Sequence, residues 1–202
     1  MKRSLLALAF VAGAVLVCPQ GDDQQVDRIL KSAKERQSTQ NDVWFKLGDY
    51  PRTIQNLKFM AEQDPSDYET VTSLGWLLFS TERYSEEWAT YTRFARMNPD
   101  MPDGALPLGE MLFNRKVWSA IPPLLEPRMQ KFEAKLHPNN FRFLGLAYQR
   151  LGDFPAAIEV FEAGLRVHPE DIGLQRNLRN AQQQRATPPP ASGSGEQAPS
   201  AG

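Results

Sequence analysis

The sequence contains few side chains that could carry out covalent or metal chemistry. Its two histidines, His137 and His168, each stand directly before a proline, with no cysteine or carboxylate pair at metal-ligand spacing. Ser194 lies in a stretch of small residues, where nothing would hold a nucleophile in position. The glycines occur singly and not in a phosphate-binding loop. We therefore expect no metal, no cofactor and no catalytic centre, and we predict that the protein is not an enzyme.

Composition narrows the class of partner. The chain has 202 residues, with 23 basic against 24 acidic side chains, so no single-sign field is available to attract a nucleic acid. Cys18 is the only cysteine, so the folded part can contain no internal disulfide and must be stabilised by packing. We expect a protein or peptide partner, recognised by shape and local chemistry.

Residues 1–20 have the features of an export signal. Lys2 and Arg3 precede an uncharged apolar run from Leu5 to Val17, which is shorter than the ~20 residues that a membrane-spanning helix needs. We predict a signal peptide, and therefore a periplasmic, cell-envelope or extracellular location. The alternative is an uncleaved anchor, which would leave the same domain on the same side of the membrane.

Two cleavage chemistries compete for the end of this segment. Ala12, Gly13 and Ala14 supply the small residues that a general signal peptidase prefers. Residues 15–18 resemble a bacterial lipoprotein box, in which the cysteine, here Cys18, is acylated and tethers the chain to a membrane. The residue before that cysteine is normally Gly, Ala or Ser, whereas this chain has Val17. Both possibilities stay open.

Four proline-containing stretches divide the middle of the chain at regular intervals. They are QDPSD at 63–67, MNPD at 97–100, LHPNN at 136–140 and VHPED at 167–171, and each follows an apolar run of helical period. Proline ends a helix because it lacks the amide hydrogen. Pro65 and Pro99 are 34 residues apart, which indicates a structural repeat. The pattern predicts helices at about 51–63, 67–80, 84–97, 103–114, 118–135, 139–151 and 155–167.

Equivalent positions of the repeats carry similar side chains. One copy has Phe141, Leu144, Gly145, Tyr148, Ala157, Phe161, Gly164 and Pro169, and an earlier copy has Val71, Leu74, Gly75, Leu78, Tyr91, Phe94 and Pro99. A third copy contributes Leu108, Gly109, Leu112 and Leu125, and a half-copy contributes Tyr50, Thr53, Leu57, Met60 and Pro65. These residues resemble the signature of the tetratricopeptide repeat (TPR) family, and with the N-terminal signal the chain resembles an exported bacterial member.

This resemblance implies an all-α fold, a right-handed α-solenoid of antiparallel helix pairs with N- and C-terminal capping helices. A TPR-like domain is expected over 21–185, with repeats at about 40–67, 68–101, 102–137 and 138–171. Residues 172–185 predict the C-terminal capping helix, with Ile172, Leu174, Leu178 and Ala181 on one side. Residues 186–202 form a tail rich in Pro, Ser and Gly that should be disordered.

Gly75, Gly109 and Gly145 occupy the same slot in three first helices. A glycine inside a helix costs ~1 kcal/mol relative to alanine, so a packing reason is expected, and close approach of the paired helix supplies it. We expect these three helices to lie side by side and to form an unbroken inner wall.

Several residues depart from the family pattern. Glu87 stands where alanine is usual, and Pro122, Pro123 and Pro127 must bend or restart the second helix of the third copy. In the first copy the family register would bury Gln37, Gln40 and Asn41. We expect instead a helix at 23–36, with Val26, Ile29, Leu30 and Ala33 on one face, followed by a loop and a short turn carrying Trp44.

The resemblance also implies which residues face the concave groove of the solenoid. The groove residues that we predict to contact a peptide are Trp76, Phe79, Leu106, Glu110, Phe113, Arg142, Leu146 and Arg150. In one interpretation the three aromatic side chains form an apolar strip that anchors a peptide or helix, while Glu110, Arg142 and Arg150 select its polar groups. In the other, the first repeat and the N-terminal helix fold into the groove and bury these rings.

The leading hypothesis is therefore an exported interaction module, an adaptor or assembly scaffold that holds a segment of another protein. A second hypothesis is a membrane-tethered structural lipoprotein that spaces envelope components, with Cys18 as its essential residue. A third is a hydrolase that uses Glu110. The membrane would be reached only through the N-terminal lipid or anchor, and the sequence does not set the oligomeric state.

Overall fold

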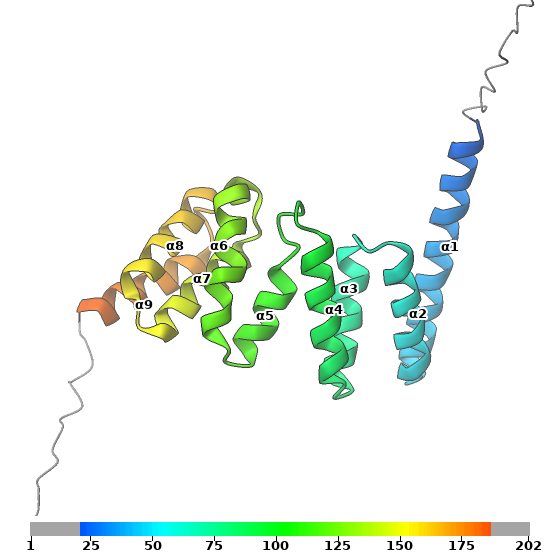
Figure 1. Ribbon diagram of the computed structural model, residues 1–202, viewed down its shortest axis with the longest axis horizontal. Coiled ribbons are helices and arrows are strands. Elements are labelled where there is room, and N and C mark those ends of the chain that lie inside the picture. The colour runs from blue at the N-terminus through cyan, green and yellow to red at the C-terminus, as the bar shows by residue number, and fades with distance from the viewer. Residues whose placement is uncertain (1–20, 187–202) are drawn as a thin grey trace, which may run out of the picture. The chain divides into compact units, whose positions relative to one another are not determined.

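The computed structural model describes residues 21–186 of the chain, with side chains from residue 23 onward. Every regular element in this range is an α- or 3-10 helix and no strand occurs in it (Figure 1), which confirms the expected all-α solenoid. None of the helices within these residues is long and apolar enough to cross a bilayer. The predicted export signal, Cys18 and all but the first residue of the predicted disordered tail lie outside the described residues.

The helix α1 (Gly21–Lys46) belongs to a unit of its own, because the chain divides into two compact units between Asp49 and Tyr50. The prediction of a helix at 23–36 followed by a loop was wrong, since the helix continues for ten further residues to Lys46. No glycine or proline interrupts it before Gly48, whose positive φ of 73° ends the segment. Of the three polar residues that the family register would bury, Asn41 is buried and Gln37 is partly buried, whereas Gln40 is exposed.

The second unit is a stack of helices in chain order. They are α2 (Tyr50–Gln63), α3 (Tyr68–Ser80), α4 (Tyr84–Met97), α5 (Leu106–Asn114), α6 (Ile121–Phe132), α7 (Pro138–Leu151), α8 (Phe154–Val167) and α9 (Ile172–Ala186). Each of these helices contacts the next along the chain. In addition, α7 contacts both α5 and α9, which are the helices two places away.

The three first-helix glycines lie in equivalent surroundings, as predicted. A Cβ atom at Gly75 would lie 2.1 Å from the ring of Tyr91, and one at Gly145 would lie 2.4 Å from the ring of Phe161. A Cβ at Gly109 would lie 3.1 Å from Leu125. In all three repeats the opposing side chain comes from the same position of the paired second helix. Glycine therefore allows each helix pair to approach closely.

The prolines restart the second helix of the third repeat, as expected. The continuous helix predicted at 118–135 is divided into a 3-10 turn (Trp118–Ala120), α6 and a second 3-10 turn (Glu133–Lys135). Pro122 and Pro123 stand in the first turn of α6, where their missing amide hydrogens are not needed. Ile121 and Leu125 stay buried on the repeat register.

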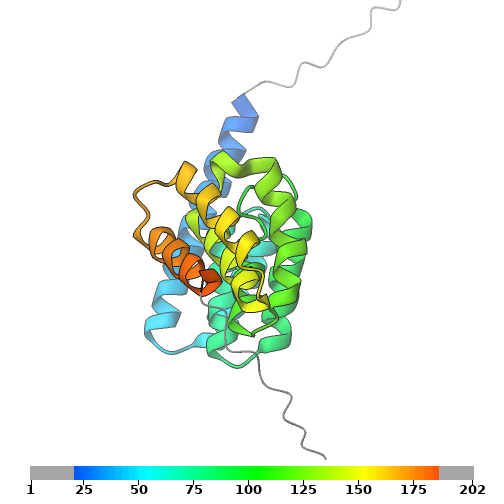
Figure 2. The same cartoon turned by 90° about the vertical axis from the view of Figure 1, so that its left-hand side faces the viewer.

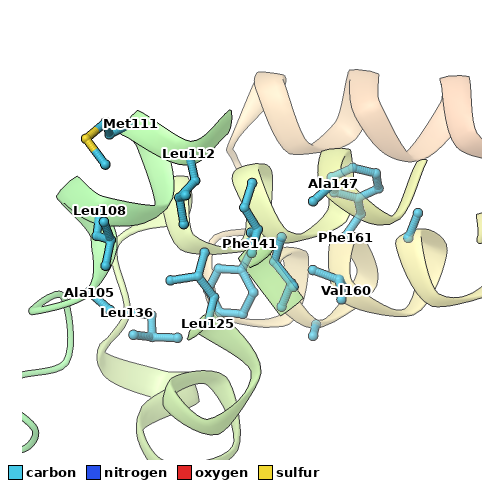
Figure 3. Packing of buried hydrophobic residues seen from close by; sticks show 14 of the residues in the cluster. Ala105, Leu108, Met111, Leu112, Leu125, Leu136, Phe141, Ala147, Val160 and Phe161 are labelled. Atoms are coloured by element: carbon cyan, nitrogen blue, oxygen red, sulfur yellow. The ribbon is translucent and has the colours of Figure 1, made fainter. Parts of the chain in front are cut away.

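The buried apolar side chains of the described residues form two clusters, both of which include residues of α3. Ile54, Leu57 and Met60 of α2 pack with Leu74, Leu77 and Leu78 of α3. The larger cluster begins at Val71 of α3 and continues to Ala181 of α9. Figure 3 shows Phe141 of α7 at its centre, among Leu125, Leu136 and Val160. Each helix pair thus shares apolar surface with the next, as a solenoid requires.

The C-terminal end of the stack is covered by α9, which contacts α7 and α8 (Figure 2). Leu174 and Ala181 are fully buried, and Leu178 packs against the core. Ile172, which the sequence placed on the same side, is 77 % exposed. It is the first residue of α9, and the buried face follows the spacing 174, 178 and 181 without it.

Candidate functional site

A cleft of about 460 Å³ lies between α3 and α5 on the side of the first helices. Its walls are Tyr68, Thr72, Trp76, Phe79 and Ser80 of α3, and Pro107, Glu110, Met111 and Asn114 of α5. Glu87 and Tyr91 of α4 and Arg115 complete the lining. In the later repeats the first helices pack directly on one another, since α5 contacts α7 and α7 contacts α9. The helices α3 and α5 lack a comparable contact, and the cleft lies between them. The expected unbroken inner wall was wrong at this point.

The connection at 98–105 joins α4 to α5 and is anchored by long-range hydrogen bonds. The helix predicted at 103–114 begins only at Leu106, after a series of turns. Within the connection, the Asp103 carboxylate accepts hydrogen bonds from the backbone N–H of His137 at 2.9 Å and from Asn140 Nδ2 at 2.7 Å. Arg128 of α6 donates to the carbonyl oxygens of Ala95 and Asn98 at 3.1 and 3.0 Å. The Asp103 bonds tie the residues before α5 to the start of α7, and the Arg128 bonds tie α6 to the end of α4.

Two large aromatic side chains are exposed in the cleft. Trp76 is 56 % exposed and Phe79 is 54 % exposed, although they lie one turn apart on a helix whose opposite face is buried. The ring of Phe79 is tilted toward that of Tyr84, with ring centres 5.9 Å apart. Exposed apolar side chains that gather in a concave surface are typical of binding sites.

Of the two carboxylates that line the cleft, one is paired with a basic side chain and the other is not. Glu87 is buried and paired with Arg115, whose guanidinium also lies 5.0 Å from the centre of the Tyr84 ring. Glu110 is exposed and forms no ion pair with any other described residue. The Tyr68 pKa is raised to about 12 by burial and by the negative charges of Asp103 and Glu110. Burial, Glu87 and Glu110 also raise the Tyr91 pKa. The cleft therefore carries a net negative field.

Three of the predicted groove residues, Trp76, Phe79 and Glu110, are brought together in this cleft. Phe113 is directed elsewhere, because its ring packs against that of Phe143 on α7, with centres 5.5 Å apart. Leu106 is only 4 % exposed and so offers no surface to a ligand. The predicted strip of three aromatic residues is thus reduced to two, and the binding role of these residues stays a prediction.

The other predicted groove residues lie on α7. Arg142 is ion-paired with Asp171, a contact that joins α7 to the start of α9. The hydrogen bond from Arg142 lowers the pKa of the Asp171 carboxyl, whose Oδ1 also accepts the backbone N–H of Leu174 at 2.8 Å. Arg142 is thus engaged in the C-terminal cap. Leu146 is half-buried against the core, and Arg150 lies with its guanidinium carbon 5.8 Å from the centre of the Trp118 ring.

Several lining residues were not assigned to the groove from sequence. Tyr68, Tyr91, Glu87 and Arg115 come from a helix start, from the second helix of the repeat and from a turn. The family's concave positions are defined on first helices that stack directly, so they omit residues that a gap exposes. Of these four residues, only Glu87 stood out in the sequence as a departure from the family pattern, because alanine is usual at its position.

A smaller groove of about 260 Å³ lies between α2 and α4, on the side of the second helices. Its charged side chains are neutralised across the groove. Arg93 Nη2 donates to Glu62 Oε2 at 2.7 Å, and Lys58 pairs with Glu86. Hydrogen bonds from Arg83 and Lys58 lower the pKa of Glu86 to about 2. These pairs connect successive second helices, so the groove is explained by the packing of the solenoid.

The two histidines have structural contacts. The His137 ring accepts the backbone N–H of Asn139 through Nδ1 at 3.2 Å and so caps α7. His168 Nε2 lies 2.8 Å from the carbonyl oxygen of Leu136, which joins the loops at the ends of two repeats. Within residues 21–186 no group of three or more side chains with metal-ligating atoms is found.

The fold defined by these helix pairs is a solenoid of the TPR type. Solved structures with this arrangement include a crystal structure of MamA, which is 20% identical with a TM-score of 0.57 and covers 72% of this chain and 79% of its own. A MamA fragment from Desulfovibrio magneticus RS-1, from residue 41 to the end, is 18% identical with a TM-score of 0.58, covering 75% and 85%.

A MamA structure from AMB-1 is 22% identical with a TM-score of 0.55, covering 73% of this chain and 86% of that one. No protein-family model matches the sequence, and no curated protein sequence matches it. At these identities the likeness to MamA is one of fold.

Proposed function

We propose that the protein is an interaction module, which binds a peptide or helical segment of another protein in the cleft between α3 and α5 and acts as an adaptor or assembly scaffold. The observation that carries this proposal is the pair Trp76 and Phe79, two large rings exposed together on the wall of a cleft. Aromatic residues of this kind dominate the energy of protein interfaces when a partner desolvates them.

The size and rim of the cleft support a polypeptide segment as the ligand. A volume of about 460 Å³ lies within the range of ligand pockets. The hydroxyl groups of Thr72 and Ser80 donate to carbonyl oxygens of α3, so they can accept hydrogen bonds from the main chain of a bound segment. The Asn114 amide can donate or accept. An apolar centre with a polar rim is the usual composition of such interfaces.

Binding is favoured over catalysis by the state of the two carboxylates. If Glu110 catalysed hydrolysis as a general base, a second side chain that can act as a general acid would be expected beside it. The other carboxylate of the cleft, Glu87, is buried and neutralised by Arg115. Turnover of a substrate that Glu110→Gln abolishes would contradict the assignment of the protein to the binding class.

Export completes the proposal, from the basic and apolar residues of the first 17 positions. The alternative, a lipid-tethered structural protein that spaces envelope components, depends on Cys18. N-terminal sequencing of the mature chain separates the possibilities. A free amino terminus beyond residue 14 fits a general signal peptidase, a blocked and acylated Cys18 fits the lipoprotein, and an intact Met1 contradicts cleavage.

Removing the exposed rings should weaken peptide binding strongly. We expect Trp76→Ala and Phe79→Ala each to lower the affinity for peptides selected on the full chain by at least about tenfold, the usual scale for an aromatic anchor. Phe59→Ala is the matched control, because Phe59 is also 54 % exposed but lies on α2 outside the cleft. Equal losses in all three variants, measured by fluorescence anisotropy, would place the binding site elsewhere.

A further inference from the structure

The charges that line the cleft distinguish one kind of peptide from another. Arg115 is the only basic side chain among the lining residues, and it is already paired with Glu87 and placed against the Tyr84 ring. Glu110 is the remaining charge, exposed and without an ion pair among residues 21–186. The cleft thus offers one uncompensated carboxylate and no available cation.

The carboxylate is placed opposite an aromatic wall. Trp76 and Glu110 are 34 residues apart and so occupy the same position in successive repeats, on the two helices that face each other across the cleft. A carboxylate and an exposed indole on the two walls of one cleft can offer a cation two favourable contacts, a charge-assisted hydrogen bond and a cation–π interaction. An anionic side chain would meet the negative field that also raises the Tyr68 and Tyr91 pKa values.

Resting on the proposed function, we infer that the segment bound by this cleft carries a lysine or arginine next to a large apolar residue. The cationic head lies between Glu110 and Trp76, and the apolar neighbour packs on Phe79 and Met111. Arg115 does not compete for Glu110, because Glu87 holds it. Glu87 therefore has a role in specificity, since it neutralises Arg115, the one basic lining residue that could otherwise pair with Glu110.

The test uses the full chain and four peptides of ten residues with blocked termini. Each has leucine and phenylalanine flanking one central residue, with glycine and serine elsewhere, and the central residue is lysine, arginine, norleucine or glutamate. Norleucine keeps the length and apolar character of the lysine stem without its charge. We expect the lysine and arginine peptides to bind about tenfold more tightly than the norleucine peptide, and the glutamate peptide to bind most weakly.

Glu110→Gln keeps the shape of the side chain and removes its charge. In this variant the lysine and norleucine peptides should bind within about twofold of each other, with the norleucine affinity unchanged. Glu162→Gln is the matched control, an exposed glutamate on α8 without an ion pair among the described residues, and it should retain the full preference. Circular dichroism of both variants verifies that they are folded.

The inference would be overturned by a wild-type affinity for the norleucine or glutamate peptide that equals the affinity for the lysine peptide. A preference for the lysine peptide that survives Glu110→Gln would overturn it as well. Failure of all four peptides to bind would contradict the proposed function itself, and the inference with it. Binding of all four without a preference would leave the proposed function intact and remove only the specificity.

Discussion

Replacing Gly145 by alanine should lower the free energy of unfolding by about 2 kcal/mol, whereas the same change at Gly109 should leave it unchanged or slightly raised. Both glycines lie inside first helices at the same repeat position, so the gain in helix propensity is equal, roughly 1 kcal/mol. The difference is in the opposing side chain. The new Cβ would meet the fully buried Phe161 ring at 2.4 Å but Leu125 at 3.1 Å.

Urea denaturation followed by circular dichroism measures both variants against the unchanged chain. A leucine can yield by a few tenths of an ångström through rotation of its branched end, whereas a buried ring must move as a whole. Equal stabilities of the two alanine variants would show that the helix pairs are not in contact at these glycines.

Phe161→Leu supplies a rescue, since it gives the fourth repeat the leucine that the third has at Leu125. Alone, this change should destabilise the protein because it removes part of a fully buried ring. Combined with Gly145→Ala it should cost less than the sum of the two single changes, by about 1 kcal/mol or more. Additive losses would contradict direct contact between the two positions.

Leu174→Ala should lower the free energy of unfolding by about 3 kcal/mol, because Leu174 is the largest fully buried side chain of α9. It is 0 % exposed, and its Cδ1 would lie 2.9 Å from a Cβ placed on Gly164 of α8. Without this contact the last repeat would expose apolar surface to water. The loss is measured as the shift of the urea midpoint.

Ile172 provides the control for Leu174, two residues away on the same helix. Because its side chain is 77 % exposed, Ile172→Ala should change the free energy of unfolding by no more than about 0.5 kcal/mol. A loss at Ile172 as large as that at Leu174 would show that α9 packs through a different face.

The sequence predicted the helix pairs because their signals are local and redundant. The prolines of the stretches between repeats stand just after the helices that they end, and the glycines of the first helices predicted close helix pairing. The rings of Tyr91 and Phe161 and the side chain of Leu125, which lie against these glycines, agree with that prediction. The capping helix was found from the same apolar period. Ile172 was misplaced because apolar spacing at a helix end does not show where the buried face begins.

The first helix and the cleft were harder to predict for different reasons. The end of α1 was placed too early because polar residues at 37–42 were treated as evidence of a loop, although none of them breaks a helix. The cleft depends on how far α5 is held from α3. The position of α5 depends on contacts between residues far apart in the sequence, such as those of Asp103 with His137 and Asn140, which no short window of sequence contains.

The central claim is that a polypeptide segment binds between α3 and α5, and photocrosslinking tests it most directly. A benzoylphenylalanine in place of Phe79 should, on irradiation with the tightest-binding of the four blocked peptides, become covalently joined to that peptide. The same residue in place of Phe59, equally exposed outside the cleft, should yield little product. Labelling at position 59 equal to or above that at position 79, quantified by mass spectrometry, would contradict the assignment of the cleft as the binding site.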